Sequence, residues 1–303
     1  MLKVSIGPIR QYPSWEWLGE DTSRELKKYF NITNFKSFSN IPASDVVLVI
    51  KQIPPIHITQ KFNVIYLPVD VFTNENQVKT SMPILRRCKL ILSHSRRLIP
   101  LLPRHTQEID HHLKFKTLKI ADYKEKGYIL WSGSYQYSPF IFKFLETHKI
   151  NNKVKLLTNY THPPDIHIAK AYADKLKTRL IQKSTGNIEL ELWTEKRQNE
   201  VLSEAKVAID IKGDSFNQQH KPPTKTQKYI CAGLPVALNK ESESYDYACS
   251  QELNTPTPDN IEYWFSKEYY EENKKVAEKL KNDLSLESIG IKLKEHIERV
   301  IQQ

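Results

Sequence analysis

The sequence predicts an α/β protein that consists of two doubly wound domains in tandem. The chain has 303 residues, more than one hydrophobic core usually serves. Short apolar runs recur along the chain and alternate with segments that have helical spacing, an order typical of parallel α/β sheets. The composition changes at the charged stretch 121–127, after which a second series of apolar runs begins. We therefore expect one domain over residues 1–122 and another over residues 123–303.

The first domain is expected to contain a buried sheet with helices between its strands. The predicted strands are mostly apolar and comprise residues 2–6, 35–38, 45–50, 63–67 and 89–93. A helix is predicted at 19–30, where Leu18, Leu26 and Phe30 lie close to one face, and another at 81–88. Because continuous apolar runs fit strands that are covered on both faces, the pattern predicts a parallel sheet.

The second domain repeats this alternation. Its predicted strands are residues 128–131, 154–158, 188–193, 207–211 and 236–238, and its predicted helices include 140–147, 165–182, 195–205, 261–280 and 288–301. Thr194 is expected to cap the helix that starts at Glu195. The last helix carries an apolar stripe that includes Leu293, Ile297 and Val300, so it is expected to pack against another element.

The stretch 220–238 predicts a basic loop, a short helix and a buried strand. Pro222 and Pro223 keep the loop extended, so the helix is expected to start at Thr224, which can cap it. Gly233 suits the left-handed residue that follows a helix end. The backbone preferences of these proline and glycine residues therefore predict where the helix begins and ends.

Lys221 and Lys225 flank the N-terminus of this predicted helix. A helix N-terminus carries unpaired N–H groups and the positive end of the helix dipole, so two lysines beside it predict an anion site. The alternative interpretation is a solvated basic turn. Elsewhere, Gly133 and Ser134 follow the predicted strand 128–131, and their backbone amides can bind a phosphate closely because glycine has no side chain.

Net charge and hydropathy narrow the class of partner. A formal charge of +10 favours an anionic partner, which is a phosphorylated small molecule, a lipid surface or nucleic acid. The charges are dispersed and no nucleic-acid-binding motif occurs, so nucleic acid is not expected as a partner. The sequence shows neither an apolar membrane span nor a signal-peptide core. We expect a cytoplasmic protein, with peripheral contact to an anionic membrane as a further candidate interaction.

The residues that commonly bind metals are sparse. Cys88, Cys231 and Cys249 are few and widely spaced, so they predict neither a disulfide framework nor a zinc site. His111 and His112 are adjacent, which does not place them on one face of an element. We therefore expect no metal to be bound by these residues.

Polar residues follow several predicted strands of the first domain. Asp70, Ser93 and His111 lie at or beyond strand ends, where parallel sheets gather their ligands. The alternative for each of them is ordinary turn chemistry. We keep these three residues as candidates for a ligand site of the first domain.

Five short motifs occur in order along the second half of the chain. They are Trp131-Ser132-Gly133-Ser134, Glu191-Leu192-Trp193-Thr194, Ala205-Lys206-Val207-Ala208-Ile209-Asp210, Lys221-Pro222-Pro223-Thr224-Lys225 and Ala232-Gly233-Leu234-Pro235-Val236. Together they resemble the donor half of GT-B glycosyltransferases, above all the group-one, family-four branch. The most specific part is the pattern Lys-x-x-x-Tyr-x-x-x-Gly-x-Pro-Val from Lys225 to Val236. The similarity covers about Tyr128 to Leu238, and in the first half it rests on strand order, the Gly7-Pro8 turn and the junction 109–112.

The resemblance implies two Rossmann-like domains that face a cleft, the GT-B arrangement. It also implies a cytoplasmic, metal-independent and retaining enzyme, similar to hexosyltransferases, that moves a sugar from a nucleotide-sugar donor to an acceptor. The nucleotide sugar would be a co-substrate rather than a cofactor, and the acceptor would be a sugar, a lipid-linked molecule or another compound. The donor would bind the C-terminal domain, the acceptor would face the N-terminal domain, and the helix at 288–301 would pack back onto the N-terminal domain.

The resemblance also suggests roles for particular residues. The donor phosphates would be bound by Gly133, Ser134, Lys221, Thr224 and Lys225, catalysis would involve His220 and Lys225, and the acceptor side would include Asp70, Ser93 and His111.

One departure from the family pattern leaves two hypotheses open. Many members carry two glutamates, separated by seven residues, at the positions that hold His220 and Lys228 here. Neither residue supplies a carboxylate. Either the site of a glycosyltransferase uses other contacts, with Lys221 and His220 nearer the leaving group, or the chain is a catalytically silent GT-B-like nucleotide-binding or scaffold protein. A nucleic-acid-binding protein is a third hypothesis, which only the net charge supports.

Overall fold

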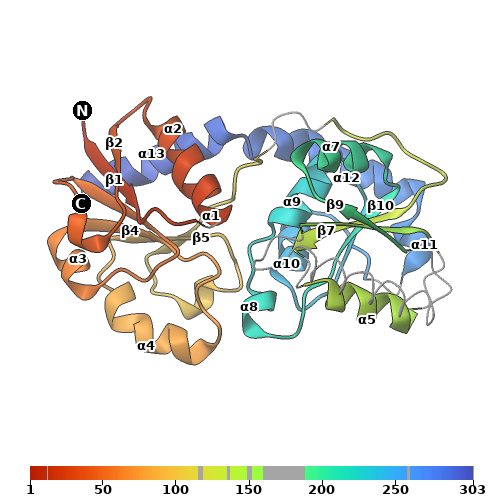
Figure 1. The fold of residues 1–303 in the computed structure, drawn as a ribbon, viewed down its shortest axis with the longest axis horizontal. Helices are drawn as coiled ribbons and strands as arrows, with labels where there is room; N and C mark the ends of the chain where they lie inside the picture. Colours follow the sequence, from red (N-terminus) through yellow and green to blue (C-terminus); the bar gives the residue numbers. More distant parts are fainter. Residues whose placement is uncertain are drawn as a thin grey trace. The chain divides into compact units, whose positions relative to one another are not determined.

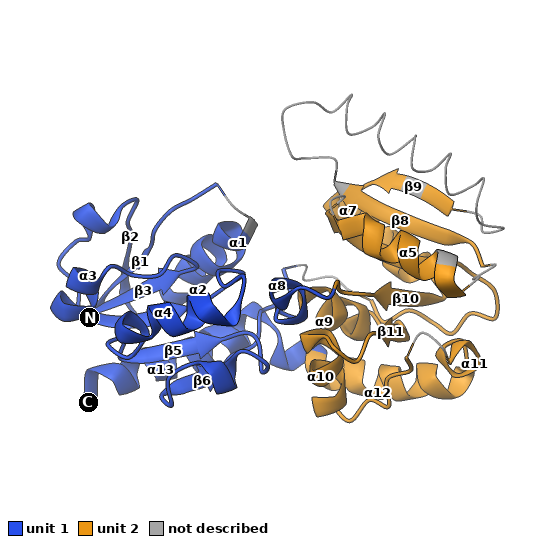
Figure 2. Ribbon diagram, turned by 90° about the horizontal axis from the view of Figure 1, so that it is seen from below, with its two compact units in different colours: residues 1–114, 214–223, 281–303 blue, residues 115–213, 224–280 orange. Residues whose placement is uncertain are grey.

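The structure, a computed structural model, describes residues 1–11, 13–114, 119–134, 137–148, 152–159, 188–257 and 260–302. The helix predicted at 165–182 lies outside the described residues. The chain forms two compact units, which Figure 2 shows in different colours. Unit 1 comprises residues 1–114, 214–223 and 281–303, and unit 2 comprises residues 115–213 and 224–280.

Unit 1 is built around a six-stranded parallel sheet in the order β2-β1-β3-β4-β5-β6 (Figure 1). Its strands are β1 (Lys3–Gly7), β2 (Asn31–Asn34), β3 (Val46–Ile50), β4 (Asn63–Leu67), β5 (Leu90–Ser93) and β6 (Thr106–Glu108). Its helices are α1 (Pro13–Trp15), a π-helical turn (Glu16–Asp21), α2 (Thr22–Leu26), α3 (Ile56–Lys61), α4 (Glu75–Leu85), α8 (Phe216–Gln219), α13 (Leu286–Gln302) and two short 3₁₀ turns (Phe38–Asn40 and Ile99–Leu101).

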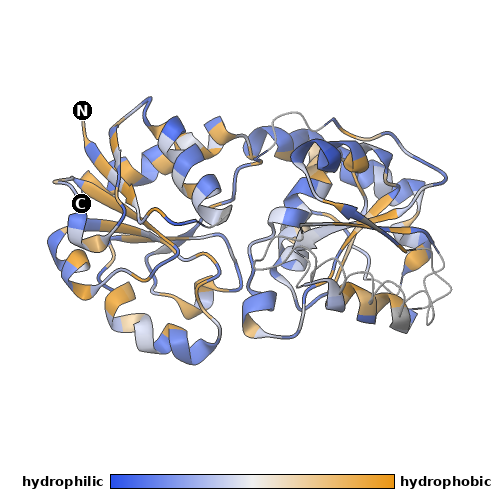
Figure 3. Ribbon diagram, in the orientation of Figure 1, coloured by the Kyte–Doolittle hydropathy of each residue, from blue (hydrophilic) through white to orange (hydrophobic). Residues whose placement is uncertain are grey.

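The central strands of unit 1 confirm the predicted buried parallel sheet. All five residues of β3 are buried, and Val47 and Val49 pack in one core cluster with Val64 and Tyr66 of β4. Figure 3 shows hydrophobic residues concentrated along these strands. These strands are apolar on both faces of the sheet, so helices must cover both faces to keep the apolar side chains from water. This requirement explains why strands and helices alternate along the chain.

Three predictions for unit 1 were wrong in position. The helix predicted at 19–30 is a π-helical turn at Glu16–Asp21 followed by α2 at Thr22–Leu26, so the helix ends four residues before Phe30. The strand predicted at 35–38 lies at Asn31–Asn34 instead, at the edge of the sheet, where its mostly polar side chains carry little apolar signal. The helix predicted at 81–88 spans Glu75–Leu85, because the Asn74 side chain accepts a hydrogen bond from the Gln77 amide (2.9 Å) and caps an earlier start.

Unit 2 contains a five-stranded parallel sheet in the order β11-β10-β7-β8-β9. Its strands are β7 (Ile129–Ser134), β8 (Val154–Asn159), β9 (Ile188–Leu192), β10 (Val207–Asp210) and β11 (Val236–Leu238). Its helices are α5 (Ser138–His148), α7 (Glu195–Glu204), α9 (Thr224–Cys231), α10 (Glu243–Ser250), α11 (Ile261–Trp264) and most of α12 (Lys267–Asp283). Thr194 caps α7 as predicted, accepting from the Arg197 amide at 3.0 Å.

The two units are not contiguous halves of the sequence. The segment 214–223 groups with unit 1, because Phe216 packs against the unit 1 core and the Asn217 side-chain amide donates to the Phe72 carbonyl (3.2 Å). The C-terminal helix α13 also belongs to unit 1 and packs against α2, β3 and β4. Its buried stripe of Leu293, Ile297 and Val300 supplies the apolar face for this contact.

Each sheet has a point at which the strand order reverses. In unit 2, the chain adds β8 and β9 on one side of β7, and then β10 and β11 on the other side. The carboxyl ends of β7 and β10 therefore lie side by side at a topological switch point, which is where doubly wound sheets bind ligands. The equivalent point in unit 1 lies between β1 and β3.

Candidate functional site

The candidate site of unit 2 lies at this switch point and centres on Asp210, the last residue of β10. Asp210 is fully buried, with 0% of its surface exposed. Its Oδ1 atom accepts from the Lys225 ammonium at 2.9 Å and from Lys212 at 3.0 Å. Its Oδ2 atom contacts Lys212 at 2.9 Å and accepts from the Thr226 and Ser244 hydroxyls at 3.1 Å each. The carboxylate is thus held from several directions.

The cluster around Asp210 contains one carboxylate and two ammonium groups. Burial alone would raise the pKa of Asp210, but Lys212 and Lys225 outweigh burial and hold that pKa well below its ordinary value. The carboxylate is therefore ionised at neutral pH and balances one of the two ammonium groups. Asp210, Lys212 and Lys225 together carry a formal charge of +1, and Lys212 is buried beside the carboxylate, so the three residues present positive charge at the end of β10.

Lys225 is the more exposed of the two cations, with 22% of its side chain accessible against 5% for Lys212. Its ammonium lies over the Trp131 ring, 4.9 Å from the centroid. A Cβ atom at Gly133 would lie 2.8 Å from the Trp131 ring and 3.2 Å from the same ammonium, so the absence of a side chain at Gly133 allows Trp131 and Lys225 to pack this closely. The end of β7 and the first turn of α9 therefore meet at the Lys225 ammonium.

The other residues of the Lys225–Val236 pattern hold α9 against the sheet. The Tyr229 hydroxyl accepts from the Ser132 amide at 2.7 Å and is 3.0 Å from the Ser132 hydroxyl, which ties α9 to the end of β7. Gly233 has φ +71°, the left-handed conformation predicted for the residue after the helix. The Pro235 carbonyl accepts from the Ala208 amide at 2.8 Å and so joins β11 to β10. Tyr229, Gly233 and Pro235 of the pattern therefore hold α9 and β11 in place, whereas Lys225 belongs to the candidate site.

The structure separates residues that the sequence places in one basic turn. Thr224, the first residue of α9, and Lys225 belong to unit 2, as do Gly133 and Ser134 at the end of β7. His220 and Lys221 belong to the segment that folds with unit 1. The basic turn predicted from the sequence is therefore divided between the two units.

His220 and Asp70 line the same small cavity in unit 1, of about 10 Å³, together with residues that include Ser95 and Pro222. The His220 Nδ1 atom donates to the Phe216 carbonyl at 2.7 Å, and its ring stacks on the Phe216 ring at 3.9 Å. This bond leaves the Nε2 atom of the neutral ring as an acceptor. Asp70 has φ +49°, a conformation that non-glycine residues adopt at an energetic cost and that often occurs at ligand sites.

His111 belongs to a buried histidine cluster in unit 1. Its ring stacks on His94 at 3.7 Å, and neither ring nitrogen has a hydrogen-bond partner among the described residues. His94 donates from Nδ1 to the Ile109 carbonyl at 2.8 Å, and His112 Nε2 lies 3.3 Å from an Asp21 carboxylate oxygen. Burial lowers the pKa of all three histidines, that of His94 to about 4, so their rings are neutral at pH 7.

Ser93, the third candidate of the first domain, has its hydroxyl engaged within its own turn. The Oγ atom donates to the Ser95 carbonyl at 2.9 Å and accepts from the Ser95 amide at 3.1 Å. Ser93 is fully buried, so these bonds fix the loop that follows β5.

Asp210 and Lys212 were missed as functional candidates by the sequence reasoning. Asp210 ends the apolar run Val207–Asp210, so it has the appearance of an ordinary strand terminus. The available signal was the pair Asp210 and Lys212 at the carboxyl end of a buried strand that precedes the basic loop. A charged side chain at the end of a buried strand needs an opposite charge or hydrogen-bond donors nearby. That requirement could have identified Asp210 as a candidate for a site.

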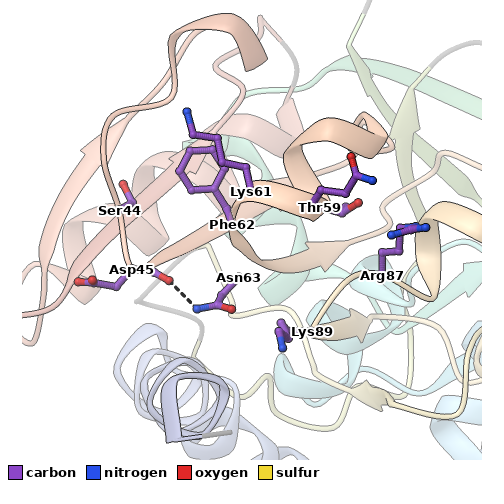
Figure 4. Close-up of a pocket in the computed structure, with 9 residues that line it drawn as sticks. Ser44, Asp45, Thr59, Lys61, Phe62, Asn63, Arg87 and Lys89 are labelled. Atoms are coloured by element: carbon purple, nitrogen blue, oxygen red, sulfur yellow. Dashed lines mark hydrogen bonds between the residues drawn. The ribbon is translucent and has the colours of Figure 1, made fainter.

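A larger cavity, of about 720 Å³, lies in unit 1 at the amino ends of β3, β4 and β5 (Figure 4). Lys61, Arg87 and Lys89 contribute cations to its lining, and Asp45 contributes one carboxylate. Lys61 ends α3, and Arg87 follows the end of α4, so these cations offset the negative ends of the two helix dipoles. Two of its three cations are thus explained without a ligand, and the cavity lies at the opposite sheet edge from the strand ends where ligands gather.

The described ranges offer neither a metal-binding cluster nor a membrane-spanning helix. They contain no group of three or more His, Cys, Asp or Glu side chains arranged to hold a metal ion. None of the helices in these ranges is both long enough and apolar enough to span a bilayer.

The fold is shared with solved glycosyltransferase structures, although no family model and no curated protein matches the sequence. AviGT4, a glycosyltransferase involved in avilamycin A biosynthesis, superposes with a TM-score of 0.65 at 10% identity, covering 100% of this chain and 98% of its own. Alr3699/HepE of Anabaena, solved with UDP and glucose, has a TM-score of 0.66 at 7% identity, covering 99% of this chain and 100% of its own. The glycosylation-associated protein complex (Gap123) of Streptococcus agalactiae has a TM-score of 0.52 at 14% identity, covering 84% of this chain and 54% of its own. These likenesses show that the chain has the GT-B glycosyltransferase fold, with two Rossmann-like domains.

Proposed function

We propose that the protein is a glycosyltransferase that moves a sugar from a nucleotide-sugar donor to an acceptor, without a metal and with retention of the anomeric configuration. The observation that carries this proposal is the buried cluster of Asp210, Lys212 and Lys225, whose net positive charge lies at the switch point of unit 2. A diphosphate is the anion that this site fits best, because a leaving nucleoside diphosphate gains negative charge as the bond to the sugar breaks. UDP in the HepE structure supports this choice of ligand.

Lys225 is the residue that we propose to contact the donor phosphates directly. Its side chain is partly accessible, it lies beside Gly133, and it belongs to the first turn of α9, whose dipole also favours an anion. An ammonium at this position can stabilise the departing diphosphate, a task that a divalent cation performs in other enzymes. The amides of Gly133 and Ser134 and the Thr224 hydroxyl would complete the phosphate contacts, and we assign Lys221 a supporting role.

For the acceptor we propose unit 1. Asp70 and His220 line one cavity there of about 10 Å³, which has room for a single hydroxyl group, and we propose that one acceptor hydroxyl donates to the Asp70 carboxylate or to His220 Nε2. His111 offers two buried ring nitrogens that lack partners among the described residues, and it is the second candidate on this side. The acceptor is a sugar, a lipid-linked molecule or another hydroxyl compound. A cytoplasmic location with peripheral contact to an anionic membrane fits the net charge of +10.

Nucleotide binding and turnover test this function separately. Calorimetric titration with UDP, GDP, ADP and dTDP should identify at least one that binds, and a ligand at about 100 times its Kd should add about 2.7 kcal/mol to stability. Lys225→Met should weaken that binding by about 10- to 150-fold, which corresponds to roughly 1.5–3 kcal/mol for a charged hydrogen bond. Lys279→Met, at an exposed lysine of α12, is the matched control and should bind normally. Absence of binding by all four diphosphates would overturn the proposed function.

A catalytically silent nucleotide-binding or scaffold protein is the second candidate. It is favoured by His220 and Lys228 at positions where the family commonly has glutamates, and by the likeness to a glycosylation-associated complex. Lys228 is buried in α9, so the site has a lysine rather than a carboxylate at that position. Diphosphate binding without sugar transfer or hydrolysis from any of the matching nucleotide sugars would select this candidate over the enzyme.

A further inference from the structure

Asp210 makes more contacts than a strand end requires. Both of its carboxylate oxygens are occupied, Oδ1 by the two lysines and Oδ2 by Lys212 and the hydroxyls of Thr226 and Ser244. A carboxylate has about four lone-pair sites, so this set uses all of them and prevents the group from rotating. The group is also completely excluded from solvent.

We propose that Asp210 is a positioning residue: it is neutralised by Lys212 and it holds the Lys225 ammonium where the donor diphosphate binds. The proposal rests on the function proposed above and deepens it, because it explains how a lysine side chain with four rotatable bonds becomes a fixed anion site. Asp210 itself needs no contact with the donor.

The division of labour between the lysines follows from their surroundings. Lys212 is 5% exposed, and its backbone is clamped by Asn239, whose Oδ1 accepts from the Lys212 amide at 2.9 Å. It is therefore fixed in place and balances the charge of Asp210. Lys225 is bonded to the same carboxylate but keeps part of its surface accessible beside Gly133. Asp210 thus fixes the position of the Lys225 ammonium, and the accessible part of the Lys225 side chain lies where a ligand can reach it.

A competing interpretation makes the opposite prediction. If Asp210 merely competed with the diphosphate for Lys225, its removal would free the lysine and raise the net charge of the cluster from +1 to +2. Diphosphate affinity would then increase. If Asp210 positions Lys225, removing the carboxylate leaves two ammonium groups that repel each other, so Lys225 turns towards solvent and affinity falls. The sign of the change distinguishes the two interpretations.

The experiment measures binding of the tightest of UDP, GDP, ADP and dTDP, with the matching nucleoside as a probe that has no phosphate. Asp210→Asn should weaken diphosphate binding by about tenfold or more and leave nucleoside binding unchanged. Lys212→Met should weaken diphosphate binding by a similar factor, because Lys225 would then be the only cation paired with Asp210 and their charges would cancel. In a Lys225→Met background, Asp210→Asn should cause little further loss, because the two residues act as one unit. Asp246→Asn, on helix α10, is a control for the loss of a carboxylate in the same unit.

Unchanged or tighter diphosphate binding by Asp210→Asn would overturn the positioning role and leave the proposed function intact. A wild-type protein that binds no diphosphate would overturn both. If Asp210→Asn does not fold, the double variant Thr226→Val/Ser244→Ala removes two hydrogen bonds to Oδ2 and keeps every charge. That variant should lose about threefold to tenfold in diphosphate affinity and none in nucleoside affinity, and wild-type affinity in it would equally overturn the role.

Discussion

At the scale of single residues, burial of His94 should make the stability of unit 1 depend on pH. Burial lowers the pKa of His94 from 6.5 to about 4, opposed in part by its bond to the Ile109 carbonyl and reinforced by His112. The unfolded chain takes up a proton below pH 6.5, whereas the folded protein does so only below about pH 4. Stability is therefore complete above pH 6.5 and falls as the pH drops towards 4. His94 alone should cost about 2 kcal/mol between pH 7 and pH 5.

Urea unfolding at pH 7 and pH 5 measures this loss. His94→Gln keeps a donor for the Ile109 carbonyl but cannot take up the proton, so this variant should lose about 2 kcal/mol less than the wild type over the same range. The other groups near His94 are His111, His112, Trp17 and Asp21, and they are unchanged in the variant. His57→Gln, at an exposed histidine, should retain the full pH dependence. Equal slopes for His94→Gln and the wild type would refute the assignment.

At the scale of elements, the junction between α9 and β11 depends on a left-handed residue. Gly233 has φ +71°, and a Cβ atom there would lie 2.6 Å from Ile120 Cγ2. Gly233→Ala should therefore lower the free energy of unfolding by at least about 1 kcal/mol, because an L-residue pays this penalty in the left-handed region. The measurement is chemical denaturation of unit 2.

Backbone strain and crowding can be separated by the same method. In an Ile120→Ala background the side-chain contact is gone, so Gly233→Ala should cost only the backbone penalty of about 1 kcal/mol. If Gly233→Ala has no effect in either background, the left-handed turn is not what fixes the end of α9.

At the scale of the whole molecule, two separate cores predict two unfolding transitions. Leu85 and Leu156 are both fully buried, Leu85 in the core of unit 1 and Leu156 in the core of unit 2. Each leucine-to-alanine change should destabilise its own unit by about 2–5 kcal/mol and lower one calorimetric transition. The diphosphate that binds tightest should raise the transition that Leu156→Ala lowers. A single transition that both variants lower equally would contradict this independence.

Much of the fold could be predicted because its signals are local. The buried strands β3, β4 and β10 contain continuous apolar runs, and a run of that kind is visible in any window of the sequence. The edge strand β2 was misplaced since a mostly exposed strand has no such signal. The contribution of 214–223 to unit 1 could not be predicted from periodicity, because it depends on Phe216 packing in a core formed far away in the sequence.

The sequence by itself determined the two α/β domains, the helix from Thr224, the left-handed Gly233 and Lys225 as the leading cation. These features depend on hydrophobic periodicity and on the backbone preferences of proline and glycine, which act within a few residues. Only the tertiary structure decided that Lys212 and Lys225 both contact Asp210, and that His220 lines a cavity of unit 1 together with Asp70. The physical reason is that strand order brings residues together at a sheet edge, and strand order is fixed by long-range packing that no local pattern contains.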